Sequence, residues 1–308
     1  MSKILAVGTV AFDEIITPFG QTGKILGGSA SYISMAAKML TDQVGIVSVI
    51  GEDFPDDYLQ KFKDRHIDIS GIEKLKGEKT FYWKGKYHND LNRRDTLVTE
   101  VNALAHFNPI VPDAFKDAEF LMLGNLHPVL QQSVIDQMSK RPKLIALDTM
   151  NFWMNTAWDD LMTVLKNIDI LIINDEEARQ LSKDYSLVRA AKTIQAMGPK
   201  YLIIKKGEHG ALLFHGQNIF FAPALPLEDV FDPTGAGDTF AGGFIGRLAK
   251  MEDIGFNAMK NAVICGSNLA SFTVEKFGTE RLESLTEAEI KARLKDFIHL
   301  TQFEIELV

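Results

Sequence analysis

The chain has 308 residues, of which 46% are hydrophobic and 24% charged, so it can bury a sizeable core and is not globally disordered. Its 33 Lys and Arg against 41 Asp and Glu give a formal net charge of −8, which argues against nucleic acid as the main partner, because phosphate backbones select clustered basic residues. The single cysteine, Cys265, cannot form an internal disulfide and is expected to be a small buried residue; with no signal-peptide pattern and no apolar run of membrane-spanning length, we expect a cytoplasmic protein.

Six short runs of the sequence predict strands that are buried on both faces. They are apolar at consecutive positions, as in a parallel sheet, and segments with helical spacing lie among them. The runs cover residues 4–7, 44–50, 120–123, 144–147, 168–173 and 201–204, and the helical segments cover residues 29–40, 55–65, 128–139, 157–167 and 187–196. This alternation predicts a doubly wound, three-layer α/β fold with a mostly parallel sheet.

One stretch, residues 72–102, departs from this alternation. Aromatic and β-branched residues at 80–87 and 96–101 flank a polar turn, which predicts an antiparallel hairpin. Residues 10–18 contain a further strand that could join it. The last third of the chain is helical, at residues 236–250, 255–274 and 287–300. Because there is no flexible linker or internal repeat, we expect one α/β domain over residues 1–308, with the two β segments, at about 10–18 and 72–102, inserted in it.

The segment that says most about chemistry is a glycine turn at the start of the predicted helix 236–250. Gly235 and Gly237 flank Ala236, so backbone N–H groups and the positive end of the helix dipole converge where an anion can bind. Asp238 lies in the first helical turn, where capping alone would explain a carboxylate. An anion site beside a carboxylate is, however, the pairing that phosphoryl transfer requires.

Other features of the sequence argue against two common nucleotide-binding motifs, the Walker loop and the dinucleotide fingerprint. Capping does not explain a second acid, Asp232, on the other side of the glycine turn with Thr234 beside it. The chain has no Gly-x-x-x-x-Gly-Lys-Ser/Thr loop, and Phe240 occupies the third glycine position of the dinucleotide fingerprint. An oxidoreductase is therefore the least favoured enzyme class.

At this point the chain resembles the ribokinase-like (PfkB-type) family of carbohydrate and nucleoside kinases. The segment 232–238 looks like that family's C-terminal signature, Asp-x-Thr-Gly-Ala-Gly-Asp. Gly27-Gly28, the Asn-x-x-Glu of residues 174–177 and the strand turn at 205–210 resemble three further motifs, in the family's order, from about residue 3 to residue 285. The resemblance implies the ribokinase-like fold, with a small β-sheet lid formed by the two inserted β segments.

The resemblance also implies ATP and Mg²⁺ as cofactors. Asp238 would be the base that deprotonates the acceptor hydroxyl, and the amides of Gly235, Ala236 and Gly237 would form the anion hole. Asn174 and Glu177 would hold Mg²⁺, mostly through water, as oxygen ligands of a hard cation. A helix cap with a first-turn acid is the alternative explanation for this last pair.

Further residues would lie along the two substrates. The family's pattern places Asp13, Gly27, Gly28, Tyr32 and Asn151 at the acceptor, and Lys205, Gly207 and Asn268 at the nucleotide. Asp13 would accept hydrogen bonds from acceptor hydroxyls, although a lone Asp after a strand is commonly a turn residue. Tyr32 stands where many sugar kinases have Asn. Asp232 and Thr234 match positions that bind a monovalent cation in many members, so K⁺ dependence is a hypothesis.

These residues predict an ATP-dependent kinase that phosphorylates a primary hydroxyl of a sugar or nucleoside. Two alternatives stay open: a phosphosugar kinase that clamps the acceptor phosphate with Lys84, Lys86, Arg93 or Arg94, and a non-catalytic sugar or nucleotide sensor on the same fold. The basic residue that follows Asp-x-Asn in many family members is missing after Asn151. The acceptor is therefore not fixed by the motifs.

Aromatic residues gather in the two inserted β segments and the first helix. They are Phe12, Tyr32, Phe81, Tyr82, Trp83 and Tyr87. Such side chains suit the face of a sugar or a nucleobase. The alternative is a homodimer that forms through the lid.

Overall fold

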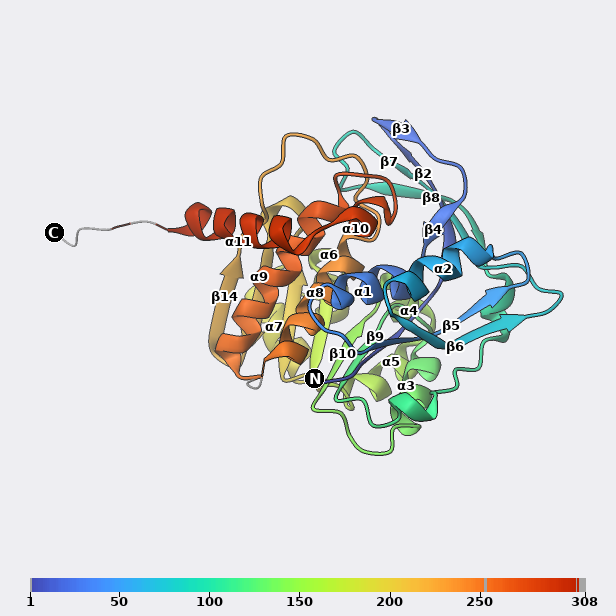
Figure 1. Ribbon diagram of the computed structural model, residues 1–308. Helices are drawn as coiled ribbons and strands as arrows, with labels where there is room; N and C mark the ends of the chain where they lie inside the picture. The colour runs from blue at the N-terminus through green and yellow to red at the C-terminus, as the bar shows by residue number, and fades with distance from the viewer. Residues whose placement is uncertain (1, 252–253, 303, 305–308) are drawn as a thin grey trace.

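A nine-stranded sheet forms the centre of the protein, in a computed structural model that describes residues 2–251, 254–302 and 304 (Figure 1). The strand order is β14-β13-β12-β11-β10-β9-β1-β5-β6. Strands from β6 to β12 in this order are parallel, and β13 and β14 add an antiparallel hairpin at one edge. The bounds are β1 Ile4–Val7, β5 Val44–Gly51, β6 Asp68–Leu75, β9 Phe120–Leu123, β10 Leu144–Asp148, β11 Ile170–Asn174, β12 Tyr201–Lys205, β13 Ala211–His215 and β14 Asn218–Ala222.

Alternate residues of these strands face two hydrophobic cores, one on each side of the sheet. In β1, Ile4 and Ala6 face one core, and Leu5 and Val7 face the other. The first core is covered by α1 (Ser29–Lys38), α2 (Asp56–Asp64), α8 (Ala236–Lys250) and α9 (Phe256–Thr273), and the second by α3 (Pro128–Asp136), α5 (Trp158–Leu165), α6 (Asp175–Ser182) and α7 (Leu187–Gln195). The expected three-layer, doubly wound arrangement is therefore confirmed.

Three shorter or peripheral helices complete the helical part. α4 (Asn151–Thr156) follows β10, whereas α10 (Glu280–Ser284) and α11 (Glu287–Thr301) pack against α9. In the part of the chain that the structure describes, no helix is both long and apolar enough to span a bilayer.

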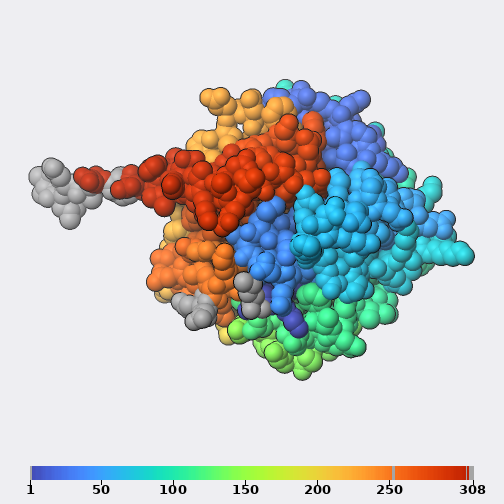
Figure 2. Space-filling view, viewed as in Figure 1, coloured from blue at the N-terminus to red at the C-terminus, as the bar shows by residue number. Residues whose placement is uncertain are grey.

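A second, five-stranded sheet lies at one corner of the molecule (Figure 1). Its order is β3-β2-β7-β8, and β4 also pairs with β2; the bounds are β2 Ala11–Thr17, β3 Gly20–Gln21, β4 Ile25–Gly27, β7 Tyr82–Tyr87 and β8 Arg94–Glu100. We call it the smaller sheet. It abuts the C-terminal third of the chain at the top of the molecule (Figure 2), where the rings of Phe19 and Phe231 are 5.2 Å apart.

Most predicted elements are present, and three expectations need correction. Residues 72–75 belong to β6 at the edge of the large sheet, not to the smaller one; this edge strand is largely polar and half exposed, so its sequence lacks the apolar run of a central strand. The smaller sheet is not purely antiparallel, because β2 and β7 run parallel. The hairpin of β13 and β14 was not predicted, although Gly216 with φ 56° marks its turn.

Candidate active site

The predicted site residues meet at the carboxyl edge of the large sheet, beneath the smaller sheet. Asp148, Asn174 and Lys205 end β10, β11 and β12, which pair in parallel and so finish at the same edge. The start of α8 faces these strand ends, because Gly237 lies against Lys205. This edge is where open α/β sheets bind ligands.

The glycine turn at the start of α8 is shaped by two close approaches. Gly235 has φ 75°, and a Cβ there would collide with the ring of Tyr32. A Cβ at Gly237 would lie 2.9 Å from Nζ of Lys205. Glycine is therefore required at the first position, and the ammonium of Lys205 sits directly beside the turn.

The three amides of the turn are not equivalent. The N–H of Ala236 donates to the carbonyl of Pro233 at 3.2 Å, so it closes the turn. Within the described residues, the N–H groups of Gly235 and Gly237 donate to no backbone carbonyl outside their own helix. These two amides, with Lys205 next to them, are therefore the ones available to the predicted anion hole.

Asp238 lies in the first turn of α8 and faces two opposing sets of charges. Burial and the nearby carboxylate of Asp148 raise its pKa, the positive charges of Lys205 and Arg94 work against the rise, and the result is a pKa of about 7. A carboxylate with a pKa near neutrality can accept a proton from a hydroxyl and release it again at pH 7.

Asp13, from β2 of the smaller sheet, is the second buried carboxylate at this edge. Burial and the charge of Asp232 raise its pKa to about 7, against the effect of a hydrogen bond from the backbone N–H of Gly28. A Cβ on Gly27 would collide with its carboxylate, and a Cβ on Gly28 would collide with the carbonyl of Thr9. The Gly27-Gly28 pair therefore makes room for Asp13 where the chain enters α1.

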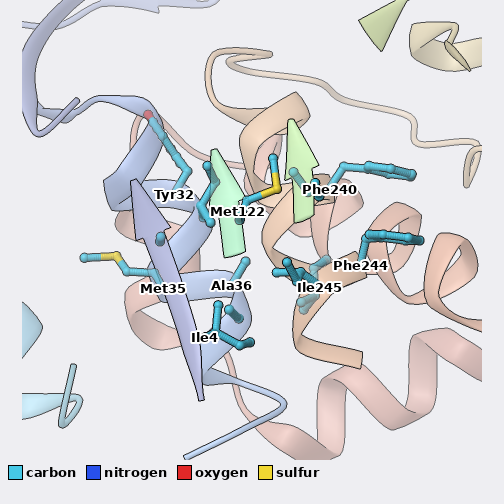
Figure 3. Packing of buried hydrophobic residues seen from close by; sticks show 14 of the residues in the cluster. Ile4, Tyr32, Met35, Ala36, Met122, Phe240, Phe244 and Ile245 are labelled. Carbon is cyan, nitrogen blue, oxygen red and sulfur yellow. The ribbon is translucent and has the colours of Figure 1, made fainter. Parts of the chain in front are cut away.

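Tyr32 lies beneath the glycine turn. The residue is 1% exposed, and its hydroxyl has no hydrogen-bond partner among the described residues. Figure 3 shows the ring at the edge of the core between α1 and α8, with the hydroxyl pointing out of that core. Burial and the negative charges of Asp13, Asp232 and Asp238 raise the pKa of this phenol well above its ordinary value. The hydroxyl is thus a donor left free among carboxylates.

Asp232 and Thr234 are held by neighbouring groups. The carboxylate of Asp232 accepts hydrogen bonds from the N–H groups of Thr234 (2.8 Å) and Gly278 (2.9 Å). The Thr234 hydroxyl donates to the hydroxyl of Tyr87 at 3.0 Å. No group of three or more His, Cys, Asp or Glu side chains is arranged to hold a metal ion in residues 2–251, 254–302 and 304. The K⁺ site stays a prediction.

The Asn-x-x-Glu motif forms the helix cap that was the alternative explanation for it. The Asn174 side chain accepts from the N–H of Glu177, and the Glu177 carboxylate accepts from the N–H of Asn174, both at 2.8 Å. Burial and the charge of Asp148 nevertheless raise the pKa of Glu177 to about 7, against the effect of Lys205. The pair therefore both caps α6 and contributes a carboxylate to the site.

Asp148 is the residue that the predicted set omitted. Its Oδ1 lies 3.7 Å from Nζ of Lys205, and burial raises the pKa of its carboxyl. A carboxylate at the end of an otherwise apolar strand was the available signal. The charge of Asp148 also raises the pKa of Glu177, an effect that a bound divalent cation would oppose.

The inner face of the smaller sheet is set by its strand register. Asp13 of β2 is opposite Trp83 of β7, and Tyr87 of β7 is opposite Arg94 of β8. Opposed residues project from the same face, so these four side chains share the face that carries Asp13. The indole of Trp83 lies across Gly85, where a Cβ would collide with it.

A scan of known families matches residues 2–285 to the pfkB family carbohydrate kinases. The chain belongs to this family. A cytidine kinase of Thermococcus kodakarensis is 31% identical over 254 residues, which cover 81% of this chain and 90% of that protein. The chain is thus an ATP-dependent kinase of the family that acts on sugars and nucleosides.

Solved structures confirm the ribokinase fold. A nucleoside kinase of Methanocaldococcus jannaschii, an archaeal member of the ribokinase family, superposes with a TM-score of 0.78 at 22% identity, covering 96% of this chain and 99% of that one. A putative ribokinase II from E. coli in complex with ATP and Mg²⁺ gives 0.77 at 21% identity, covering 96% and 100%.

Three residues predicted by the family resemblance make contacts other than those described above, and their predicted roles stay predictions. Asn268 is fully buried, and its amide donates to the carbonyl of Ile290 at 3.0 Å, between α9 and α11, while its Oδ1 has no partner among the described residues. Asn151 is exposed at the start of α4. Gly207 faces the hairpin of the smaller sheet, since a Cβ there would lie 3.0 Å from Oδ1 of Asn92.

Proposed function

We propose that the chain is a nucleoside kinase, which transfers the γ-phosphoryl group of ATP to the primary hydroxyl of a ribonucleoside, with cytidine as the first candidate. The observation that carries the proposal is the pairing of Asp13 and Trp83 across β2 and β7. A carboxylate that accepts from sugar hydroxyls next to a flat aromatic surface for a base fits a nucleoside better than a free sugar. The 31% identity to a cytidine kinase supports the same acceptor.

The proposed mechanism uses the groups described above in fixed roles. Asp13 and the hydroxyl of Tyr32 orient the acceptor, and Asp238 takes the proton from its primary hydroxyl as the oxygen attacks the γ-phosphorus. The new O–P bond forms while the bond to the β-phosphate oxygen breaks, and ADP leaves. The amides of Gly235 and Gly237 stabilise the charge on the transferring group.

Mg²⁺ fits the donor set at the strand ends. Asp148 and Glu177 are buried carboxylates with raised pKa values, the state that a divalent cation relieves. When bound, Mg²⁺ would neutralise charge on the ATP phosphates. Lys205, at the end of β12 and next to the start of α8, would contact the same phosphates.

Two alternatives are less well supported. In a phosphosugar kinase, the lid cations would face the acceptor. Lys84 pairs with Glu14 at 2.7 Å on the face opposite Asp13, and Arg93 lies 3.8 Å from Asp90 in the exposed turn, so this alternative depends on Arg94, which shares the face of Asp13. A non-catalytic sensor would not need a proton-accepting carboxylate, Asp238, next to the anion turn and the strand-end carboxylates.

The lid-mediated homodimer, which the lid aromatic residues suggested in the sequence, is retained as a proposal on a different observation. Every residue of β8 is exposed, including Leu97 and Val98, which are 48% and 36% exposed. An edge strand of this kind is open to pairing with a second copy.

ADP formation with a panel of acceptors tests the proposed function. Cytidine, uridine, adenosine and inosine are compared with ribose, fructose and fructose 6-phosphate, and the Asp238→Asn variant is the inactive control. Turnover on nucleosides at least about tenfold above that on free sugars supports the proposal, since stacking and base contacts contribute about 1–3 kcal/mol. Turnover only on fructose 6-phosphate contradicts it, and no turnover on any acceptor favours the sensor.

A further inference from the structure

The hairpin of the smaller sheet is attached to the anion turn through one tyrosine. The Tyr87 hydroxyl accepts from Oγ1 of Thr234 at 3.0 Å, and Thr234 immediately precedes Gly235. Tyr87 itself is 5% exposed, so the contact is enclosed between the smaller sheet and the large one. The end of β7 is therefore fixed close to the N-terminus of α8.

Arg94 starts β8 directly opposite Tyr87. Its guanidinium lies 5.6 Å from the centre of the Trp83 ring, and it interacts with the Tyr87 hydroxyl. Because opposed residues share a face, Arg94 projects from the face that carries Asp13, toward the large sheet. The strand register thus brings a lid arginine to the edge of the anion turn.

Arg94 has no acidic partner within the part of the chain that the structure describes. Among the described residues, no carboxylate oxygen lies within 4.0 Å of its guanidinium, whereas the other cations nearby have partners: Lys205 pairs with Asp148, and Lys84 with Glu14. Arg94 is also exposed to solvent. An unpaired, accessible cation at this place is available to an incoming anion.

Arg94 interacts electrostatically with carboxylates at both proposed substrate positions, the acceptor and the ATP phosphates. Against the larger effect of burial, its positive charge lowers the pKa of Asp13, on the acceptor side, and of Asp238 and Glu177, on the phosphate side. Arg94 is thus near the point where the phosphoryl group crosses from one substrate to the other.

We propose that Arg94 is a catalytic residue supplied by the smaller sheet, whose guanidinium binds the non-bridging oxygens of the transferring phosphoryl group while the Tyr87–Thr234 hydrogen bond holds it against the anion turn. This inference rests on the proposed kinase reaction. It also accounts for the missing basic residue after Asn151, since a positive charge reaches the same edge from the smaller sheet instead of from the end of β10. A planar guanidinium can hold two phosphoryl oxygens at once, which an ammonium cannot.

The test compares two neighbouring arginines. In the full-length protein, Arg94→Met removes the cation, Arg94→Lys keeps the charge without the fork, and Arg93→Met is the matched control. Arg93 has a side chain 83% exposed and lies 3.8 Å from Asp90, so the structure places it outside the site. We expect Arg94→Met to lower kcat by about 10²–10³-fold with the KM for the acceptor changed less than about fivefold. Arg94→Lys should fall between, and Arg93→Met should match the parent.

Two further measurements separate a catalytic role from a structural one. Added guanidinium ion at millimolar concentration should restore part of the kcat of an Arg94→Ala variant and leave Arg93→Ala unchanged. Tyr87→Phe should lower kcat less than Arg94→Met, because it loosens the hairpin without removing the cation. A kcat within threefold of the parent for Arg94→Met overturns the proposal, as does a loss confined to the KM of a phosphorylated acceptor.

A readout that needs no acceptor keeps this test independent of the proposed function. The affinity for ADP with aluminium fluoride and Mg²⁺, relative to ADP with Mg²⁺ alone, measures how well the site holds a transferring phosphoryl group. Arg94→Met should reduce this ratio by at least about tenfold even if no nucleoside is a substrate. An unchanged ratio in a variant that melts like the parent overturns the role of Arg94 and leaves the kinase proposal standing.

Discussion

Lys205 and Asp148 approach each other across a strand that separates them: they end β12 and β10, and β11 lies between those two strands in the sheet. Their Nζ and Oδ1 atoms are 3.7 Å apart. The ion pair therefore spans the end of β11, next to the start of α6, where Glu177 forms part of the cap. Both of its charges also act on Asp238 of α8. Besides the effect of burial, Asp148 raises the pKa of both Glu177 and Asp238, and Lys205 lowers both. One ion pair therefore adjusts the protonation of two separate carboxylates.

The pH dependence of turnover should report this adjustment. Because Asp238 must be ionised to accept the hydroxyl proton and its pKa is about 7, kcat/KM for the acceptor should fall below pH 7. Lys205→Met removes a charge that lowers this pKa, so the acid limb should move to higher pH, by about one unit. Lys206→Met, a change at the adjacent position, should leave the limb in place. A shift of the limb to lower pH in Lys205→Met would be incompatible with Asp238 as the base.

Asp238→Asn should separate catalysis from binding. The amide cannot accept the proton, so kcat should fall by about 10³–10⁴-fold while ATP affinity, measured by calorimetry, changes less than about threefold. Glu176→Gln, an exposed acid in the first turn of α6, is the control and should keep full activity. Retained turnover in Asp238→Asn would remove this residue from the base role.

The same substitution should stabilise the free protein at alkaline pH. Since the folded-state pKa of Asp238 is raised from 3.8 to about 7, the folded protein holds its proton more tightly than the unfolded chain. The stability contribution is complete below the unfolded pKa and is lost as pH rises through 7. Asn carries no such charge, so Asp238→Asn should gain about 1–2 kcal/mol at pH 8, after allowing for solvent screening, and little at pH 4. Denaturant unfolding at the two pH values measures this; equal effects at both would contradict the raised pKa.

The effect of the close approach of Tyr32 to Gly235 can be separated from the effect of positive φ by comparison with Gly216. Gly235 has φ 75° and a Cβ there would meet the Tyr32 ring, whereas Gly216, with φ 56°, has no atom within 4 Å of an added Cβ. Gly216→Ala should cost about 1 kcal/mol of unfolding free energy and leave kcat unchanged. Gly235→Ala should cost about 2–4 kcal/mol and also lower kcat at least about a hundredfold, because the amide turn is displaced. Equal effects of the two substitutions would show that the approach of Tyr32 does not matter.

The sequence predicted the local features of the site better than its long-range pairs. Continuous apolar runs located β1 and β9 to the residue, because strands buried on both faces need them. The glycine turn was recognisable because conformation there is a local property. The Lys205–Asp148 pair was not, since it joins strands whose order in the sheet is fixed by packing. The inward direction of Arg94 depends on the register of β7 and β8, including its bulge next to Gly85, and a shift of one residue would have sent it outward.

Tyr32 gives the most direct test of the acceptor side. Its buried hydroxyl has no hydrogen-bond partner in the described part of the chain, so it costs stability in the free protein and becomes useful only when a ligand pairs with it. Tyr32→Phe should therefore leave the free energy of unfolding unchanged or raise it by up to about 1 kcal/mol, while it raises the KM for the nucleoside about tenfold and leaves the KM for ATP unchanged.

Tyr82→Phe should show the reverse pattern and serves as the control for Tyr32→Phe. The Tyr82 hydroxyl donates to Oε2 of Glu14 at 2.7 Å on the face of the smaller sheet opposite Asp13. Its removal breaks a hydrogen bond to a charged group, which should cost about 1–2 kcal/mol of stability without affecting the acceptor KM. If Tyr32→Phe destabilises the protein and leaves the acceptor KM unchanged, the Tyr32 hydroxyl belongs to the fold, and the acceptor is oriented by Asp13 without it.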